Sequence, residues 1–142
     1  MDAALEQARR ARDAVEVPIG AVVSIDGAIV GRGFNQPISS GDPTAHAEIV
    51  AIRDAARQVG NYRLTGAVLC VTIEPCLMCV GALVHARIAT VVFGAAEPKF
   101  GALVSGVRAG DLPGLNHRFE MIAGVREPEC RELMQAFFRS RR

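Results

Sequence analysis

Two short motifs in this chain carry side chains that suit a common metal ion. The need to bring the two motifs together would constrain the fold more than any other feature. The first motif is His46-Ala47-Glu48 and the second is Pro75-Cys76-Leu77-Met78-Cys79. One imidazole and two thiolates form a ligand set that zinc takes in tetrahedral sites with an open fourth position. If these side chains share one ion, the fold has to bring two distant segments of the chain together.

Hydrophobic periodicity predicts helices and strands around the first motif. Residues 2–14 carry apolar side chains at helical spacing, which indicates an amphipathic helix. We expect strands at residues 19–25 and 28–34, because the intervening Asp26-Gly27 is a dipeptide that tight hairpin turns favour. Residues 35–43 are rich in polar, Pro and Gly residues and are predicted to form a loop.

The remainder of the chain is predicted to alternate helices and strands. Asp42-Pro43 is a helix-start signal, and the helix is expected to run to about Val59. Glu74-Pro75 is expected to open a second helix that ends near His85. This order predicts an α/β protein with three layers, α/β/α, in which helices cover both faces of a five-stranded sheet. The other predicted elements are strands at 67–73, 90–94 and 118–122, an irregular region at 101–116 and a helix at 128–138.

Length and composition limit the class of protein. A chain of 142 residues with 50% hydrophobic content fits one domain over residues 1–142, with a core that needs no disulfide. Residues 1–12 alternate charge with alanine, so we expect no signal peptide, no membrane span and a cytoplasmic location. The net charge of +1 means that any basic surface has to be local. The densest candidate is residues 139–142, whose arginines would equally suit a solvated helix end.

The cysteine motif, taken alone, also suits sites of a different kind. The Cys76 and Cys79 pair fits a thioredoxin-like redox site, or half of a structural four-cysteine zinc site completed by Cys70 and Cys130. Cys70 lies in an apolar predicted strand and Cys130 in the last predicted helix, where a small buried side chain is the simpler interpretation.

The first motif raises a question of geometry. His46 and Glu48 are two residues apart, and side chains with that spacing in a regular helix do not share a face. We expect His46 in the first turn of its helix. Both side chains can then reach one metal only where the backbone departs from ideal helical geometry.

Joined in this order, the motifs match the zinc-deaminase signature H-x-E followed by P-C-x-x-C. Beyond the signature, the chain resembles the bacterial tRNA-specific adenosine deaminases nearly end to end. The resemblance rests on residues 16–22, Asn35, 42–48, 61–64, 74–81, 85–88, 91–95, Lys99, 101–102, 116–118 and 137–139. The segment 97–106 departs from the usual pattern of that family at Glu97-Pro98-Lys99, Phe100 and Val104-Ser105-Gly106.

The resemblance implies a cytidine deaminase-like fold with a mixed sheet. It implies one Zn²⁺ per subunit, held by His46, Cys76 and Cys79, and a catalytic role for Glu48 as the residue that moves protons. The implied reaction is hydrolytic deamination of adenosine to inosine by zinc-activated water at the wobble position of tRNA anticodons.

The same resemblance implies how substrate binds. Asn35 would hydrogen-bond the flipped nucleotide, Ile19 and Ile38 would line the base pocket, and Ala47 would also contact substrate. The partners it implies are a tRNA anticodon stem-loop and a second copy of the chain in a homodimer, with no membrane. The candidates for contact with the RNA are Lys99, Arg139, Arg141 and Arg142.

Two other functions are compatible with the metal motifs. A deaminase of free nucleobases or nucleosides, such as cytosine, cytidine or guanine, would carry the same signature. A non-catalytic, zinc-stabilised RNA-binding module is a third possibility. Glu48 favours an enzyme, because a structural site closes its fourth position with another ligand and needs no adjacent carboxylate.

Overall fold

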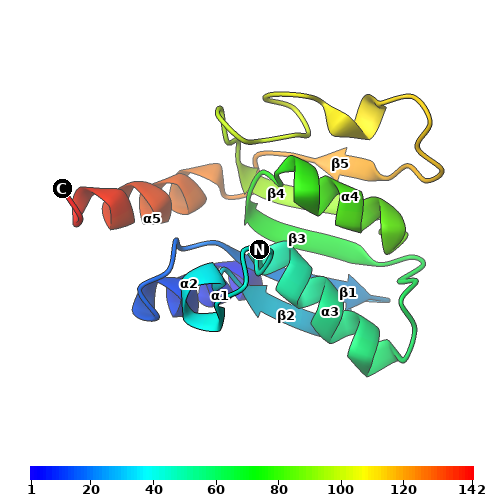
Figure 1. The fold of residues 1–142 in the computed structure, drawn as a ribbon, viewed down its shortest axis with the longest axis horizontal. Coiled ribbons are helices and arrows are strands. Elements are labelled where there is room, and N and C mark those ends of the chain that lie inside the picture. Colours follow the sequence, from blue (N-terminus) through cyan, green and yellow to red (C-terminus); the bar gives the residue numbers. More distant parts are fainter.

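The computed structural model describes residues 1–142, and its elements follow the predicted order (Figure 1). No helix has both the length and the apolar character needed to span a membrane. The elements are α1 (Asp2–Asp13), β1 (Gly20–Ile25), β2 (Ala28–Phe34), α2 (Pro37–Ser40), α3 (Ala47–Val59), β3 (Val68–Ile73), α4 (Leu77–His85), β4 (Thr90–Ala95), the 3₁₀ turn η1 (Ala109–Asp111), β5 (Glu120–Ile122) and α5 (Glu127–Arg139).

The five strands form one mixed sheet in the order β2-β1-β3-β4-β5, which confirms the predicted sheet. β1 pairs antiparallel with both β2 and β3, whereas β4 runs parallel to β3 and to β5. The turn between β1 and β2 has the backbone that its sequence predicts, with φ of 50° at Asp26 and 79° at Gly27.

Helices cover both faces of the sheet, as predicted. α3 packs on β1 and β2 and also contacts α4, and these helices share the larger core with inward side chains of the strands. α1 contacts β1, and α5 contacts β4 and β3, where smaller apolar clusters form. Figure 1 shows α3 and α4 side by side on one face, with the N-terminal ends of both helices at the same edge of the sheet.

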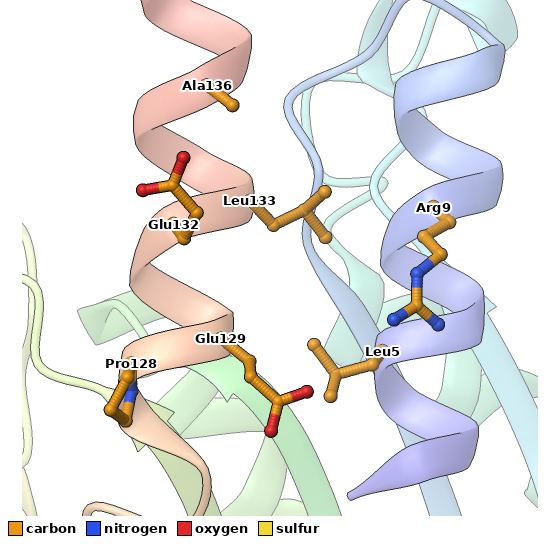
Figure 2. A pocket seen from close by; sticks show the side chains of 7 residues that line it. All are labelled: Leu5, Arg9, Pro128, Glu129, Glu132, Leu133 and Ala136. Carbon is orange, nitrogen blue, oxygen red and sulfur yellow. The ribbon is translucent and has the colours of Figure 1, made fainter.

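α1 and α5 lie next to each other and leave a shallow groove between them (Figure 2). Leu5 and Leu133 point toward each other across its floor, and Arg9 and Glu129 stand at its sides. None of the predicted metal ligands lines this groove.

Glycines in β2 let α3 lie directly on the sheet. A Cβ atom added at Gly33 would stand 2.4 Å from the Ala47 carbonyl oxygen and 2.4 Å from the Ala51 nitrogen. One added at Gly31 would meet the Ala51 carbonyl oxygen at 2.4 Å. Real Cβ contacts are much longer, so only glycine permits this approach. The approach fixes the position of the first turn of α3, just after the histidine of the first motif.

Both helices of the metal motifs begin later than predicted. α3 begins at Ala47 rather than at Pro43, because the Asp42 carboxylate accepts hydrogen bonds from the Thr44 N–H at 2.8 Å and hydroxyl at 2.7 Å in a turn before the helix. α4 begins at Leu77 rather than at Glu74-Pro75, since the Glu74 carboxylate is engaged by another segment. The predicted loop 35–43 also contains the short helix α2.

Candidate metal centre and substrate cleft

His46 and Cys76 occupy the same position in their two helices, directly before the first helical residue. His46 has φ −70° and ψ 153° ahead of α3, and Cys76 has φ −79° and ψ 172° ahead of α4. Both conformations are extended, so the expectation that His46 lies in the first helical turn is wrong. This also answers the question of geometry. Because His46 lies before the helix, its side chain does not follow the helical directions that would separate it from Glu48.

The three predicted metal ligands converge. The His46 Nδ1 atom lies 3.5 Å from Cys76 Sγ and 3.6 Å from Cys79 Sγ, and the three atoms are all within 4.8 Å of one another. Tetrahedral zinc, with bonds of about 2.05 Å to nitrogen and about 2.3 Å to sulfur, separates such atoms by about 3.6 Å. The ligand atoms are therefore placed to bind one zinc ion.

The interactions among these three residues favour a thiolate. The Cys79 thiol hydrogen-bonds Cys76 and, together with the nearby His46, lowers the pKa of Cys76 to about 4. The same bond to Cys76, with burial, raises the pKa of Cys79, and the contact with Cys76 raises the pKa of His46. One sulfur thus retains a proton that zinc has to displace, since metal-bound cysteine is deprotonated.

Cys70 and Cys130 do not join this site. Both are buried on the α1 and α5 side of the sheet, where their sulfurs lie 4.0 Å and 3.9 Å from the Met1 sulfur. The only group of three potential ligands is His46 with Cys76 and Cys79. The structure thus contradicts the alternative of a four-cysteine zinc site.

Glu48 lies beside the ligands and outside the ligand group. It is the second residue of α3 and is only 4% exposed. Burial raises the pKa of its carboxyl to about 7. The site therefore combines three potential metal ligands with a buried carboxylate that can exchange protons.

A cleft of about 730 Å³ opens over the metal ligands and Glu48. Its mixture of apolar and polar walls and its size suit a single nucleotide. The lining residues come from segments far apart in the sequence: Val17, Ile19, Asn35, Pro37, His46, Glu48, Ile73, Glu74, Cys76, Glu97, Lys99, Phe100, Met134 and Phe138.

The structure brings two of the predicted substrate residues into the cleft wall. Asn35 is 6% exposed and its backbone N–H donates to the Ile19 carbonyl at 2.9 Å, so these two wall residues are held together. Ile38 is 77% exposed on α2 and is not part of the lining. Ala47 is fully buried in the main core and is not part of the lining either.

The four predicted basic residues gather around a second hollow next to the cleft. Lys99 lines both, and Arg139, Arg141 and Arg142 from the end of the chain line the second hollow only. In the sequence Lys99 is far from the three arginines, whereas in the structure all four residues line one hollow. We call Lys99, Arg139, Arg141 and Arg142 the basic rim.

Sequence reasoning predicts only a place at a helix start for Glu74 and misses its role in the cleft. Glu74 is 3% exposed, lines the cleft and accepts hydrogen bonds from residues 97 and 103–105. Burial opposes ionisation, but the Ser105 hydroxyl and the backbone N–H groups outweigh it and hold the pKa of Glu74 below its usual range. The one signal in the sequence is an acidic residue beside the Pro-Cys motif.

Comparison with known proteins places the chain in a family. The family model for the zinc-binding region of cytidine and deoxycytidylate deaminases matches residues 1–95. The tRNA-specific adenosine deaminase of Haemophilus influenzae is 46% identical over 140 residues, which cover 98% of this chain and 81% of that protein. The protein of the same name from Agrobacterium fabrum is 45% identical over 142 residues, covering 100% and 93%.

The fold agrees with these sequence relationships. A solved structure from a study of A-to-I editing by tRNA:A34 deaminases at the wobble position of transfer RNA matches with a TM-score of 0.92. It is 45% identical in sequence, and the match covers 94% of this chain and 96% of the other. The ligand geometry, the fold and the sequence similarity lead to one conclusion: the chain belongs to the cytidine and deoxycytidylate deaminase family.

Proposed function

We propose that this protein is a single-domain, cytoplasmic enzyme that converts adenosine to inosine at the wobble position of tRNA anticodons. The observation that carries the proposal is a His-Cys-Cys ligand set at zinc spacing, with the buried non-ligand Glu48 beside it, under a nucleotide-sized cleft. Relatives named tRNA-specific adenosine deaminases are 45–46% identical over at least 98% of the chain.

His46, Cys76 and Cys79 would hold the zinc, which when bound lowers the pKa of a water molecule and so favours its attack on C6 of adenine. Glu48 takes a proton from the attacking water and delivers it to N1 of the base. It then assists departure of the C6 amino group as ammonia. Burial of Glu48 keeps bulk water out of these transfers, so the proton taken from the attacking water passes to the substrate.

Asn35 and the residues around it would hold the nucleotide. The Asn35 side chain supplies an amide at the cleft wall, where it can hydrogen-bond the base or sugar, and Ile19 supplies apolar contact. Ile38 lies on α2 next to Pro37, a lining residue, and can contact a neighbouring nucleotide. The backbone of Ala47 lies between a metal ligand and the proton carrier, within reach of the reacting base.

A loop nucleotide fits this cleft better than a base in a duplex. The enzyme has to surround a single base, and an unstacked loop base reaches such a pocket at lower cost than a paired one. The basic rim of Lys99, Arg139, Arg141 and Arg142 next to the cleft would contact the phosphates on either side of that base. A net charge of +1 fits RNA contact only if the cations gather in this way.

We include a homodimer in the proposal, and its support is an apolar surface. Between α3 and α4 a groove is lined by apolar side chains, among them Ile49, Ile52 and Ala82. Tyr62, which is 69% exposed, adds its ring to the apolar surface of the groove. A second copy of the chain would bury this surface.

The decisive experiment offers substrates of different classes to the same preparation. We expect an anticodon stem-loop with adenosine at the wobble position to gain about 1 Da, as oxygen replaces an NH group, when analysed by mass spectrometry. Free adenosine, cytidine, cytosine and guanine are tested beside it, and the Glu48→Gln variant controls for contaminating activity. Conversion of a free base with an untouched stem-loop would overturn the choice of substrate. Zinc binding without ammonia release from any of them would favour a non-catalytic RNA-binding module.

A further inference from the structure

One buried carboxylate outside the metal ligand set organises a wall of the cleft. Glu74 Oε1 accepts hydrogen bonds from the backbone N–H groups of Leu103 at 3.0 Å, Val104 at 2.7 Å and Ser105 at 3.0 Å. Its Oε2 accepts from the Glu97 N–H at 3.0 Å and the Ser105 hydroxyl at 2.5 Å. Five donors from one loop therefore converge on a side chain that is 3% exposed.

The same loop is fastened to the segment that carries a metal ligand. The Ala102 N–H donates to the Pro75 carbonyl at 2.9 Å, and Gly101 forms a β-bridge with Cys76. A Cβ atom added at Gly101 would lie 2.4 Å from the carboxyl carbon of Glu74. The loop therefore contacts both the Glu74 carboxylate and the metal-binding turn.

The first half of the loop faces substrate. Lys99 and Phe100 line the cleft, and Phe100 is 74% exposed at its mouth. The Lys99 N–H donates to Glu97 Oε1 at 2.9 Å, and the Gly101 N–H donates to the Glu97 carbonyl at 2.8 Å. The position of Lys99 and Phe100 therefore depends on Glu97, whose own N–H is held by Glu74.

We propose that Glu74 is a positioning residue that sets the affinity for RNA, by holding residues 97–101 so that Lys99 and Phe100 meet the substrate. The inference rests on the proposed function. It assigns to Glu74 a role apart from metal binding and apart from proton transfer. It also gives a function to Ser105, because the Ser105 hydroxyl is one of the five donors.

Replacing Glu74 by glutamine should affect its hydrogen bond to residue 97 and its hydrogen bonds to residues 103–105 differently. Its amide oxygen can still accept from residues 103–105, but its NH₂ group replaces the oxygen that accepted the Glu97 N–H. The Ser105 hydroxyl can turn to accept from that NH₂, whereas the Glu97 N–H then faces another donor. Glu74→Gln is therefore expected to release residues 97–101 and to leave residues 103–105 in place.

Hydrogen exchange tests the structural part without any assumption about substrate. In zinc-loaded protein, Glu74→Gln is expected to speed exchange of the amides of Glu97, Lys99 and Gly101 at least tenfold relative to wild type, with little change at residues 103–105 and an unchanged zinc content. Glu6→Gln, in which an exposed glutamate of α1 is changed, is the matched control and should exchange as wild type does. Equal protection of residues 97–101 in both variants would overturn the proposal.

Kinetics on a wobble-adenosine stem-loop test the functional part. Glu74→Gln is expected to raise KM about tenfold while kcat changes less than about twofold, since the metal ligands and Glu48 stay in place. In a double-mutant cycle, Lys99→Ala should raise KM in the wild-type background and have little further effect in the Glu74→Gln background. A fall in kcat alone, or effects of the two variants that simply multiply, would contradict the role. If the wild type leaves the stem-loop untouched, the proposed function fails, and hydrogen exchange still decides whether Glu74 holds the loop.

Discussion

The His46 Nδ1 atom and the Cys76 Sγ atom lie 3.5 Å apart, and each belongs to the residue directly before a helix. Extended backbone at these two positions turns both side chains toward a common point between the helix ends. Cys79, in the first turn of α4, completes the group. The N-termini of two helices favour negative charge, so the same arrangement stabilises the thiolates that zinc requires.

Zinc removal should destabilise the wild-type protein, because the three ligand atoms converge only in the folded state. A ligand that binds only the folded state at a thousand times its Kd contributes about 4 kcal/mol, so chelation should lower the Tm by about 10 °C or more. Cys76→Ser should bind less than one zinc per chain and show a much smaller shift. Cys70→Ala, which removes a buried thiol elsewhere, is the control and should retain zinc. If chelation leaves the Tm of the wild-type protein unchanged, that result would contradict the metal site.

Replacing the buried carboxylate should separate metal binding from turnover. Glu48→Gln conserves the volume of the side chain and leaves His46, Cys76 and Cys79 unchanged, so we expect a full zinc content. Its amide cannot carry protons, and general acid-base help of this kind is worth about 10²- to 10⁴-fold. We therefore expect inosine formation to fall by at least about 10²-fold, measured by single-turnover conversion of a stem-loop. Activity near the wild-type rate in a zinc-loaded variant would remove Glu48 from the mechanism.

The close approach of α3 to β2 should make Gly33 intolerant of any side chain. Gly33→Ala puts a Cβ atom 2.4 Å from backbone atoms of α3, and such overpacking costs about 1–3 kcal/mol. Because α3 has to move, we also expect weaker zinc binding through His46. Gly81→Ala in α4 meets open space and should raise stability by up to about 1 kcal/mol, since alanine favours helix. Urea unfolding of both variants gives the comparison, and equal stabilities would contradict the packing argument.

The turn before His46 predicts a pH effect with a definite sign. The Thr44 hydroxyl and N–H both donate to Asp42 and lower the pKa of its carboxyl. A folded-state pKa below the unfolded value of about 3.9 means that Asp42 stabilises the fold above that pH, and that this stabilisation disappears as the pH falls through the folded pKa. Thr44→Val should raise the pKa of Asp42 toward its ordinary value in an NMR titration. Thr65→Val, at an exposed loop residue, should leave it unchanged.

Sequence alone predicted every strand within about two residues, because β3 and β4 are near-continuous apolar runs and Asp26-Gly27 marks the hairpin. Helix starts were less predictable. Asp42-Pro43 carries the residue types of a helix start, yet the Asp42 side chain closes a turn with Thr44 instead. Local patterns cannot tell these two uses of one carboxylate apart.

The metal ligands could be predicted because their chemistry is encoded in residue type and spacing. Glu74 could not, because four of its five donors are backbone N–H groups of residues 97 and 103–105, which almost any residue type would offer. Its role depends on an irregular loop folding back onto the cysteine turn, and no periodicity predicts that path. The shared rim of Lys99 and the terminal arginines is likewise set by tertiary packing of α5 beside that loop.

The apolar groove between α3 and α4 predicts the outcome of a test for self-association. Tyr62 stands exposed at its edge, and Ala82 of α4 also lines the groove. We expect sedimentation equilibrium to give a dimer for the wild type and a shift to monomer for Tyr62→Glu, because the substitution replaces an apolar ring with a charge that loses hydration when the interface closes. Tyr62→Phe keeps the apolar ring and should remain dimeric. The substitution lies outside the metal site, so zinc content should not change. A wild-type monomer at concentrations of tens of micromolar, or a Tyr62→Glu variant that still dimerises, would place the second copy elsewhere or exclude it.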